Sequence, residues 1–176
     1  MADPKSRMIQ TMRELCRKKD IDKISVSELV AAAGVSRQTF YKYYQDKYEL
    51  AMAVYLADVY RRSEAAYQKD REFKSMCLAL LSAVKESPRL YQTLFRDKHA
   101  QNSFMAQFHA FSLELNCNTI GRANMTNGMY AVLDGWLAAT DKVFSDWVLG
   151  GMKEPEELIV DVFIRLMPIE IRPFLL

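Results

Sequence analysis

Arg37, Gln38 and Thr39 are consecutive side chains of the types that hydrogen-bond to base pairs in the major groove of DNA. An arginine can donate two hydrogen bonds to guanine, a glutamine can pair with adenine, and a threonine offers a hydroxyl and a methyl group. Nearby cationic and phenolic side chains can contact phosphate groups. The other members of this candidate DNA-contacting set are Ser36, Tyr41, Lys42 and Lys47.

Two short helices separated by a tight turn are expected to position these side chains. Ser25 and Glu28 form a capping box that begins the first helix, and Gly34 supplies the left-handed conformation that ends it. Ser36 is a suitable N-cap for a second helix that begins at Arg37. Two short capped helices joined by Gly-Val-Ser fit a helix-turn-helix, in which the second helix enters the major groove.

Helices on either side of this motif complete the expected N-terminal domain. The first has a stripe of apolar residues, and Asp46 with Glu49 forms a second capping box that begins a long fourth helix ending near residue 68. Lys47 would lie in the first turn of that helix, where backbone N–H groups attract anions. The residues expected to pack the motif together are Leu29, Val30, Val35, Phe40 and Tyr44.

The remaining sequence also has helical periodicity. The apolar spacing predicts helices over residues 73–84, 89–98, 101–119, 127–149 and 155–166, with a loop at 121–127. We therefore expect an all-α fold of about nine helices. Its three-helix N-terminal domain at residues 1–50 would continue through the fourth helix into a helical bundle at residues 51–176.

Composition and charge narrow the class of protein further. Of 176 residues, 50% are hydrophobic and 26% charged, which suits a folded core, and the few glycines (6) and prolines (5) disfavour a many-stranded β fold. The N-terminal 50 residues carry ten Lys/Arg and seven Asp/Glu, a charge of +3 within a total of +2. We see no signal peptide or membrane span, and expect a cytoplasmic protein. The residues expected to be buried thiols are Cys16, Cys77 and Cys117.

The segment SVSELVAAAGVSRQTFYKYYQDKYEL at residues 25–50 resembles the DNA-binding domain of the tetracycline-repressor (TetR) family of transcriptional regulators. The family pattern has a T/S-V-x-x-I/L-A start, a G-V-S turn, a short F-Y-x-Y-F helix and a K-x-x-L opening of the fourth helix. The match extends over residues 7–52, about a quarter of the chain. The short length and the I-S-V-S-x-L start are also similar to the subgroup of dihydroxyacetone-kinase operon regulators.

The resemblance implies roles for individual residues. Tyr41 and Lys47 match the tyrosine and lysine that clamp the DNA backbone, while Phe40 and Tyr44 match packing positions. This sequence departs from the family at Tyr44, where Phe is most common, and at Asp20-Ile21, where Gly-Phe is usual. The residues that would begin the recognition helix are Ser36, Arg37, Gln38 and Thr39.

A second candidate site is a small-molecule pocket in the bundle. Aromatic and methionine side chains can line such a pocket, although the same residue types also form ordinary bundle cores, and both interpretations stay open here. We expect no cofactor and no metal, because His99 and His109 lie far apart with no cysteine or paired carboxylates near them. The candidate pocket residues are Met76, Leu80, Phe95, Phe104, Phe108, His109, Tyr130 and Trp136.

The resemblance implies a homodimer that binds a near-palindromic operator in double-stranded DNA. The last two long helices would form a four-helix interface, unless their apolar faces, which include Trp136, Trp147, Leu158 and Leu166, cover only their own domain. The two recognition helices would then lie roughly 34–36 Å apart. Control by a small-molecule effector is expected, and control by a protein partner without a pocket is the alternative. An enzyme is disfavoured because the sequence has no G-x-S-x-G, P-loop or G-x-G-x-x-G motif.

Overall fold

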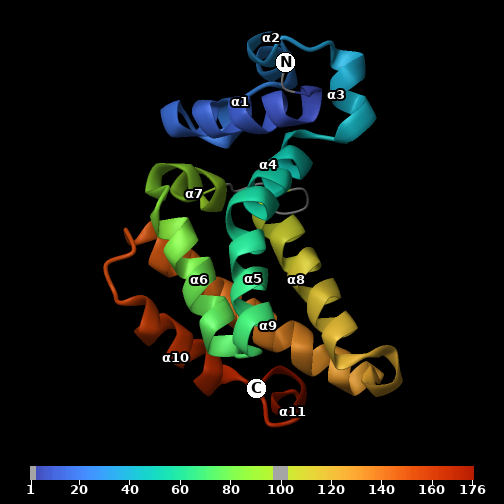
Figure 1. Ribbon diagram of the computed structural model, residues 1–176, viewed down its shortest axis with the longest axis vertical. Helices are drawn as coiled ribbons and strands as arrows, with labels where there is room; N and C mark the ends of the chain where they lie inside the picture. Colours follow the sequence, from blue (N-terminus) through green and yellow to red (C-terminus); the bar gives the residue numbers. More distant parts are fainter. Residues whose placement is uncertain (1–2, 97–102) are drawn as a thin grey trace.

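The computed structural model describes residues 3–96 and 103–176, and every regular element within these ranges is helical. A small group of helices lies at one end of the molecule and a longer bundle at the other, with α4 (Lys47–Tyr55) leading from one to the other (Figure 1). The all-α class predicted from periodicity is therefore confirmed. His99 lies outside the described residues.

The N-terminal head, residues 4–43, consists of α1 (Pro4–Lys18), the 3₁₀ turn η1 (Ile21–Lys23), α2 (Val26–Ala33) and α3 (Arg37–Tyr43). The side chain of Asp3 caps α1 by accepting a hydrogen bond from the backbone of Ser6. The buried side of α1 carries Met8, Met12 and Cys16, as the apolar stripe predicted. Helix α1 packs against α2 within the head and against α4, the helix that follows the head.

One continuous helix connects the head to the bundle. It comprises α4 (Lys47–Tyr55), a π-helical turn η2 (Leu56–Tyr60) and α5 (Arg61–Asp70), and the backbone stays right-handed helical through both junctions. Arg71, in the left-handed conformation with φ of 63°, ends it two residues beyond the predicted end. The proposed boundary between residues 50 and 51 falls inside this helix.

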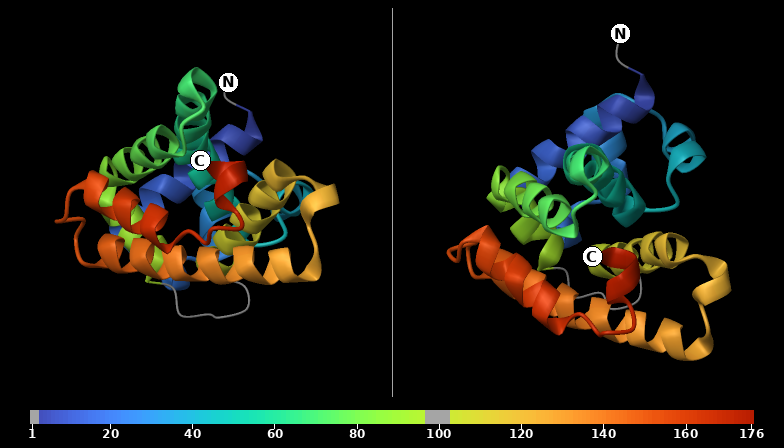
Figure 2. Two further views of the ribbon diagram at one scale, coloured as in Figure 1. Left: turned by 90° about the horizontal axis from the view of Figure 1, so that it is seen from below. Right: turned by 60° about the horizontal axis from the view of Figure 1, so that its bottom comes forward.

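The bundle is completed by α6 (Phe73–Lys85), α7 (Pro88–Phe95), α8 (Phe104–Ile120), the 3₁₀ turn η3 (Arg122–Asn124), α9 (Asn127–Leu149), α10 (Glu156–Leu166) and α11 (Arg172–Leu175). Figure 2 shows α9 spanning the width of the bundle with α10 beside it. Pro88 begins α7 and Thr126 caps α9, which explains why both starts were predictable.

Two differences from the sequence prediction concern short elements. The described residues contain ten α-helices when α4, η2 and α5 count as one, whereas we expected about nine. The additional helix is α11, whose four residues are too few to show a periodicity. The predicted loop after α8, residues 121–127, contains the 3₁₀ turn η3 at its centre.

Aromatic rings fill the centre of the bundle. Phe95 lies edge-on to Phe144 with ring centroids 4.9 Å apart, and Phe104 stacks on Phe108 at 6.2 Å. Of the three cysteines, Cys16 and Cys77 are buried as predicted, and burial raises the pKa of Cys16 to about 12. The prediction was wrong for Cys117, which packs against the edge of the core and is only half-buried.

Candidate nucleic-acid interface and cavity

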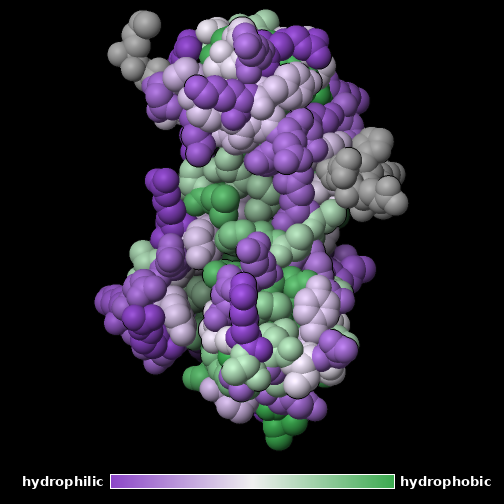
Figure 3. All heavy atoms as spheres, turned by 90° about the vertical axis from the view of Figure 1, so that its right-hand side faces the viewer, coloured by the Kyte–Doolittle hydropathy of each residue, from purple (hydrophilic) through white to green (hydrophobic). Residues whose placement is uncertain are grey.

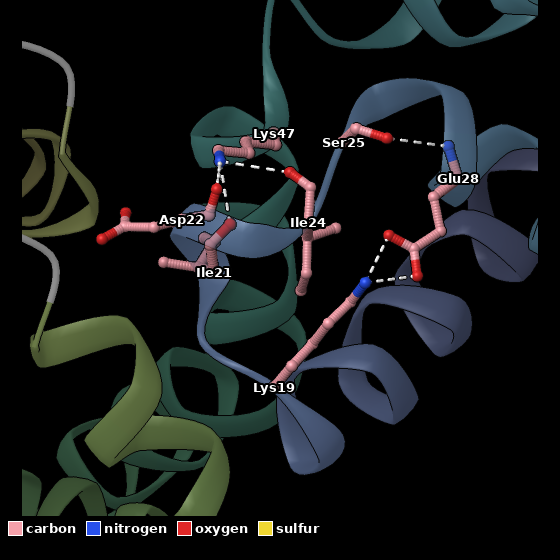
Figure 4. Close-up of polar contacts among 7 residues, drawn as sticks. All are labelled: Lys19, Ile21, Asp22, Ile24, Ser25, Glu28 and Lys47. Atoms are coloured by element: carbon pink, nitrogen blue, oxygen red, sulfur yellow. Dashed lines mark hydrogen bonds and ion pairs between the residues drawn. The ribbon is translucent and has the colours of Figure 1, made fainter.

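The start of α2 is fixed by its cap and by an ion pair. The Ser25 hydroxyl accepts a hydrogen bond from the backbone N–H of Glu28 at 3.1 Å, as the capping box predicted. The Glu28 carboxylate, however, binds Lys19 at 2.5 and 2.6 Å, so it is turned toward the end of α1 (Figure 4). This pair links α1 to α2.

The turn between α2 and α3 depends on a glycine and an arginine. Gly34 has φ of 63° and ψ of 38°, a conformation that costs other residues energy. Arg7 of α1 donates a hydrogen bond to the Gly34 carbonyl at 3.1 Å, and a Cβ at position 34 would lie 3.2 Å from the same nitrogen. The hydrogen bond from Arg7 therefore fixes the turn that orients α3 to helix α1.

α3 buries one side and exposes the other. Phe40 is completely buried and packs edge-on against the ring of Tyr41 at 5.2 Å. Of the predicted DNA-contacting residues on this helix, Thr39 is half-buried and the others are exposed. The structure brings four of them together around one shallow depression: Gln38, Thr39, Tyr41 and Lys42.

The remaining predicted contacts at the start of α3 have partners within the head. Ser36 caps the helix by accepting from the Thr39 backbone at 3.0 Å, and the two hydroxyls lie 2.8 Å apart. Arg37 is exposed but donates a hydrogen bond to the Ser27 hydroxyl at 3.0 Å. This hydrogen bond ties the beginning of α3 to α2.

Lys47 differs in position from the other predicted contacts. Its ammonium donates to the backbone carbonyls of Ile21, Asp22 and Ile24 at 2.8, 3.2 and 3.1 Å (Figure 4). An ammonium has three donors, so these carbonyls occupy all of them. In this arrangement Lys47 stabilises the junction of η1 and α4.

Tyr44 occupies the packing position predicted for it, with its ring 5.9 Å from that of Phe40. Its side chain is buried, and its hydroxyl has no hydrogen-bond partner within the described part of the chain. Burial raises the pKa of Tyr44 to about 12. The departure from the family's usual Phe thus places an unsatisfied polar atom in the core of the head.

A cavity of about 110 Å³ lies inside the bundle, between the connecting helix, α6, α8, α9 and α10. Four of the predicted pocket residues line it: Met76, Leu80, Phe108 and Trp136. Phe95 and Phe104 belong instead to the aromatic core beside it. The structure does not bring Tyr130 into the cavity, since this side chain is 49% exposed on α9.

Several lining residues were missed by the sequence analysis. Tyr55, which precedes the π-helical turn, and Tyr60, its last residue, belong to this set, as do the polar residues Thr140 and Asp141 of α9. The spacing of Trp136, Thr140 and Asp141 places them on one side of a helix, and that pattern was available in the sequence. What it could not show was that this side faces an unfilled space.

A second, outer chamber of about 200 Å³ adjoins the cavity. The two share Tyr60, Phe73, Met76, Leu115 and Asn116 as lining residues. The outer chamber reaches Glu64 on α5 and the C-terminal helix α11 through Leu175. These shared residues place the two chambers side by side, next to α5, α6 and α8.

His109, the remaining predicted pocket residue, lies between two carboxylates. Its Nδ1 is 2.6 Å from Asp141 Oδ2, and its Nε2 is 2.9 Å from Asp134 Oδ1. Burial alone would lower the pKa of His109, but the hydrogen bonds to Asp134 and Asp141 outweigh it and the pKa is raised. Burial raises the pKa of Asp141, which also lines the cavity. His109 is therefore not itself a lining residue, but its hydrogen bond orients Asp141, which lines the cavity.

The part of the chain that the structure describes contains no cluster of three or more side chains arranged to bind a metal ion. The two carboxylates at His109 bind opposite ring nitrogens, which leaves no common point for a metal. None of the described helices has the length and apolar character of a membrane-spanning segment.

The head matches a known family. Residues 9–54 match the family model described as bacterial regulatory proteins, tetR family. This range contains all of the predicted DNA-contacting residues. A comparison with curated proteins gave no significant match.

The fold of the chain is similar to that of several solved structures. The dihydroxyacetone kinase operon activator DhaS has a TM-score of 0.58 and 20% identity over 98% of each chain. A TetR transcriptional regulator from Rhodococcus sp. RHA1 has a TM-score of 0.60 and 18% identity over 93% of this chain and 95% of that one. A tetR-family transcriptional regulator from Streptomyces coelicolor has a TM-score of 0.54 and 20% identity over 97% and 83%. At these identities the likeness shows the fold.

Proposed function

We propose that this chain is a sequence-specific transcriptional regulator of the tetR type, controlled by a small-molecule effector; its residues 9–54 match the family model of these bacterial regulatory proteins. The observation that carries the proposal is the exposed side of α3, where residues suited to DNA surround one depression while Phe40 anchors the helix. We propose a binding function and not an enzymatic one, because the family and the similar structures are regulators. We propose that it acts in the cytoplasm, where a bacterial regulator meets its DNA.

The proposed division of labour follows from side-chain chemistry. Arg37, Gln38 and Thr39 contact base edges, while Tyr41 and Lys42 contact phosphates. On binding DNA, Arg37 exchanges its hydrogen bond to Ser27 for one to a base. Ser36 caps the start of the recognition helix, whereas Lys47 stabilises the junction of η1 and α4. Either side chain would contact phosphate only by sharing its present hydrogen-bond partners.

A homodimer is proposed because α9 and α10 keep an unpartnered surface. Trp136 and Trp147 are buried and donate hydrogen bonds within their own chain, so part of the apolar surface covers its own domain. The exposed side of α9, in contrast, carries Ala131, Gly135 and Ala138 at a helical spacing that allows a second helix to approach closely. Large apolar residues are also exposed at the end of α9, on α10 and shortly after it: Leu149, Leu158, Leu166 and Ile169.

The proposed path from effector to DNA runs through the π-helical turn. Tyr55, which precedes η2, and Tyr60, its last residue, line the cavity. Asp58 within η2 forms a bidentate ion pair with Arg13 of α1. A ligand that displaces either tyrosine therefore acts on the segment that holds α1. In a dimer this would shift the population between two separations of the heads.

The proposal is tested by incubating the purified protein with sheared genomic DNA, recovering the bound fragments and sequencing them at several salt concentrations. We expect enrichment of one near-palindromic sequence, with an affinity that falls steeply as salt rises. Uniform recovery of all sequences would contradict sequence-specific regulation.

The enriched fragment then allows the two modes of control to be distinguished. Release of the fragment by a small molecule that also raises the melting temperature supports effector control. A protein that co-purifies and changes DNA affinity, with no ligand occupying the cavity, would support the alternative of a protein partner.

A further inference from the structure

The two chambers combine aromatic walls with acidic groups. The inner chamber is lined by rings that include Tyr55, Phe108 and Trp136, and its ionisable carboxylate is Asp141. The outer chamber adds Tyr67 and the carboxylate of Glu64. Among the described residues that line either chamber there is no lysine, arginine or histidine. The fixed charge available to a bound ligand is therefore negative.

Asp141 is available to a ligand on one side. Its Oδ2 is held by His109 Nδ1 at 2.6 Å, and among the hydrogen bonds of the described residues none involves Oδ1. Its side chain is 14% exposed. Since His109 is shared with Asp134, the three groups carry one negative charge in excess when all are ionised. A partly buried carboxylate of this kind gains from a cationic or hydrogen-bond-donating partner.

The aromatic walls favour the same kind of ligand. A cation over the face of a Trp, Tyr or Phe ring is attracted by the ring's quadrupole, and the attraction strengthens when water is excluded. An anion in this space would be repelled by Asp141 and would face no compensating cation. A neutral hydrocarbon would leave the carboxylate without a partner.

The volumes restrict the size of the ligand. An apolar cavity of about 150 Å³ accommodates benzene, so the inner chamber of about 110 Å³ takes an ammonium group with a few carbon atoms. The outer chamber of about 200 Å³ takes one aromatic ring. The residues that line both chambers, such as Phe73 and Met76, would surround the middle of the bound ligand.

We propose that the cavity binds a small organic cation, an amine or ammonium compound with an aromatic body, whose positive group pairs with Asp141. This inference rests on the proposed effector site and names the chemical class that the site takes. Its direct test does not depend on DNA.

The test compares three probes of similar shape: 2-phenylethylamine, 2-phenylethanol and phenylacetate. Binding is measured calorimetrically on the full chain at neutral pH. Quenching of tryptophan fluorescence provides a second readout, since Trp136 lines the inner chamber. We expect the amine to bind at least tenfold more tightly than the alcohol, and phenylacetate to bind more weakly than both. Equal affinities, a preference for phenylacetate, or no binding of any probe would overturn the inference.

Two matched variants test whether Asp141 is the carboxylate that pairs with the ligand's positive group. Asp141→Asn removes the carboxylate that lines the cavity, whereas Asp134→Asn removes the other carboxylate on His109, which is not among the lining residues. We expect Asp141→Asn to abolish the preference for the amine over the alcohol, and Asp134→Asn to retain it. Equal effects of both variants would overturn the role of Asp141. If Asp141→Asn fails to fold, the order of the three probes on the unaltered chain still decides the charge preference.

DNA binding separates this inference from the proposed function. If an enriched DNA fragment is bound but the amine is not, the cation inference fails and sequence-specific DNA binding stands. If the amine binds in an Asp141-dependent manner without affecting DNA, the inference stands and control through this site fails.

Discussion

The hydroxyl of Tyr44 lies inside the head without a hydrogen-bond partner among the described residues, next to the ring of Phe40. We predict that Tyr44→Phe increases the free energy of unfolding by about 1 kcal/mol, because it removes a buried polar atom and keeps the ring. Urea unfolding followed by circular dichroism measures this change. Tyr43→Phe is the control, since Tyr43 is 39% exposed and should be neutral. A loss of stability in Tyr44→Phe would reveal a partner for the hydroxyl.

Arg37 is the residue at which base discrimination is tested. We predict that Arg37→Ala loses roughly 1–3 kcal/mol of discrimination at one base pair, since a bidentate contact to guanine is removed. Lys42→Ala, on the same exposed side of α3, should instead weaken all sequences alike. Binding to the enriched fragment and to its single-base variants measures both effects. An equal loss on every sequence for Arg37→Ala would exclude base contact.

For individual residues, the sequence predicted which side chains form hydrogen bonds, but it predicted their partners only where these lie close along the chain. The capping hydroxyls of Ser25 and Ser36 were predictable because their partners lie three residues away on the chain. The three carbonyls bound by Lys47 belong to residues more than twenty positions earlier, and their approach depends on the packing of α1 and α4. A local pattern contains no information about that approach.

At the scale of elements, the ion pair between Arg13 and Asp58 links α1 to the π-helical turn. We predict a coupling energy of about 1 kcal/mol from a double-mutant cycle with Arg13→Ala and Asp58→Ala, at the upper end for pairs that solvent partly screens. Thermal or urea unfolding of the four proteins gives the value. Strictly additive single effects would show that packing alone holds α1 on the connecting helix.

Most helices of this fold were predictable, whereas the π-helical turn was not. Caps and prolines mark the starts of α2, α3, α7 and α9, and glycine marks the end of α2. The residues of η2 show no local signal for a π-helical turn, and its surroundings, which are α6, the cavity and the ion pair to Arg13 of α1, lie far away along the sequence. The cavity itself is a space between five helices, which periodicity along one helix cannot show.

For the whole molecule, Gly135 offers a direct test of the dimer. Nothing lies within 4 Å of the position that its Cβ would occupy, so an isolated chain tolerates a side chain there. We predict that Gly135→Arg converts dimer to monomer, as measured by light scattering, because the side chain would fill the space of a partner helix. Ser82→Arg, an exposed position on α6, is the control. A dimer that persists in Gly135→Arg would exclude the α9 surface.

Stability should depend on pH through His109, whose hydrogen bonds join α8 to α9. Because its pKa is raised in the folded chain, His109 contributes stability that is present below its unfolded pKa of about 6.5 and is lost as pH rises through the folded value. We predict that the stability difference between the unaltered chain and His109→Gln is largest below about pH 6.5 and shrinks as pH rises through the raised pKa of His109. Urea unfolding at each pH measures it, and a constant difference would contradict a charged His109.

The π-helical turn has a consequence for how the chain length can vary. A turn closed by i→i+5 hydrogen bonds contains one residue more than the α-helical turn it replaces, while the flanking helices keep their own geometry. Loss of one residue within Leu56–Tyr60 would therefore restore a uniform helix and leave the buried sides of α4 and α5 facing their present neighbours. Single-residue deletions should be tolerated here and nowhere else along the connecting helix. Natural length variants of such proteins are accordingly expected to differ at this turn.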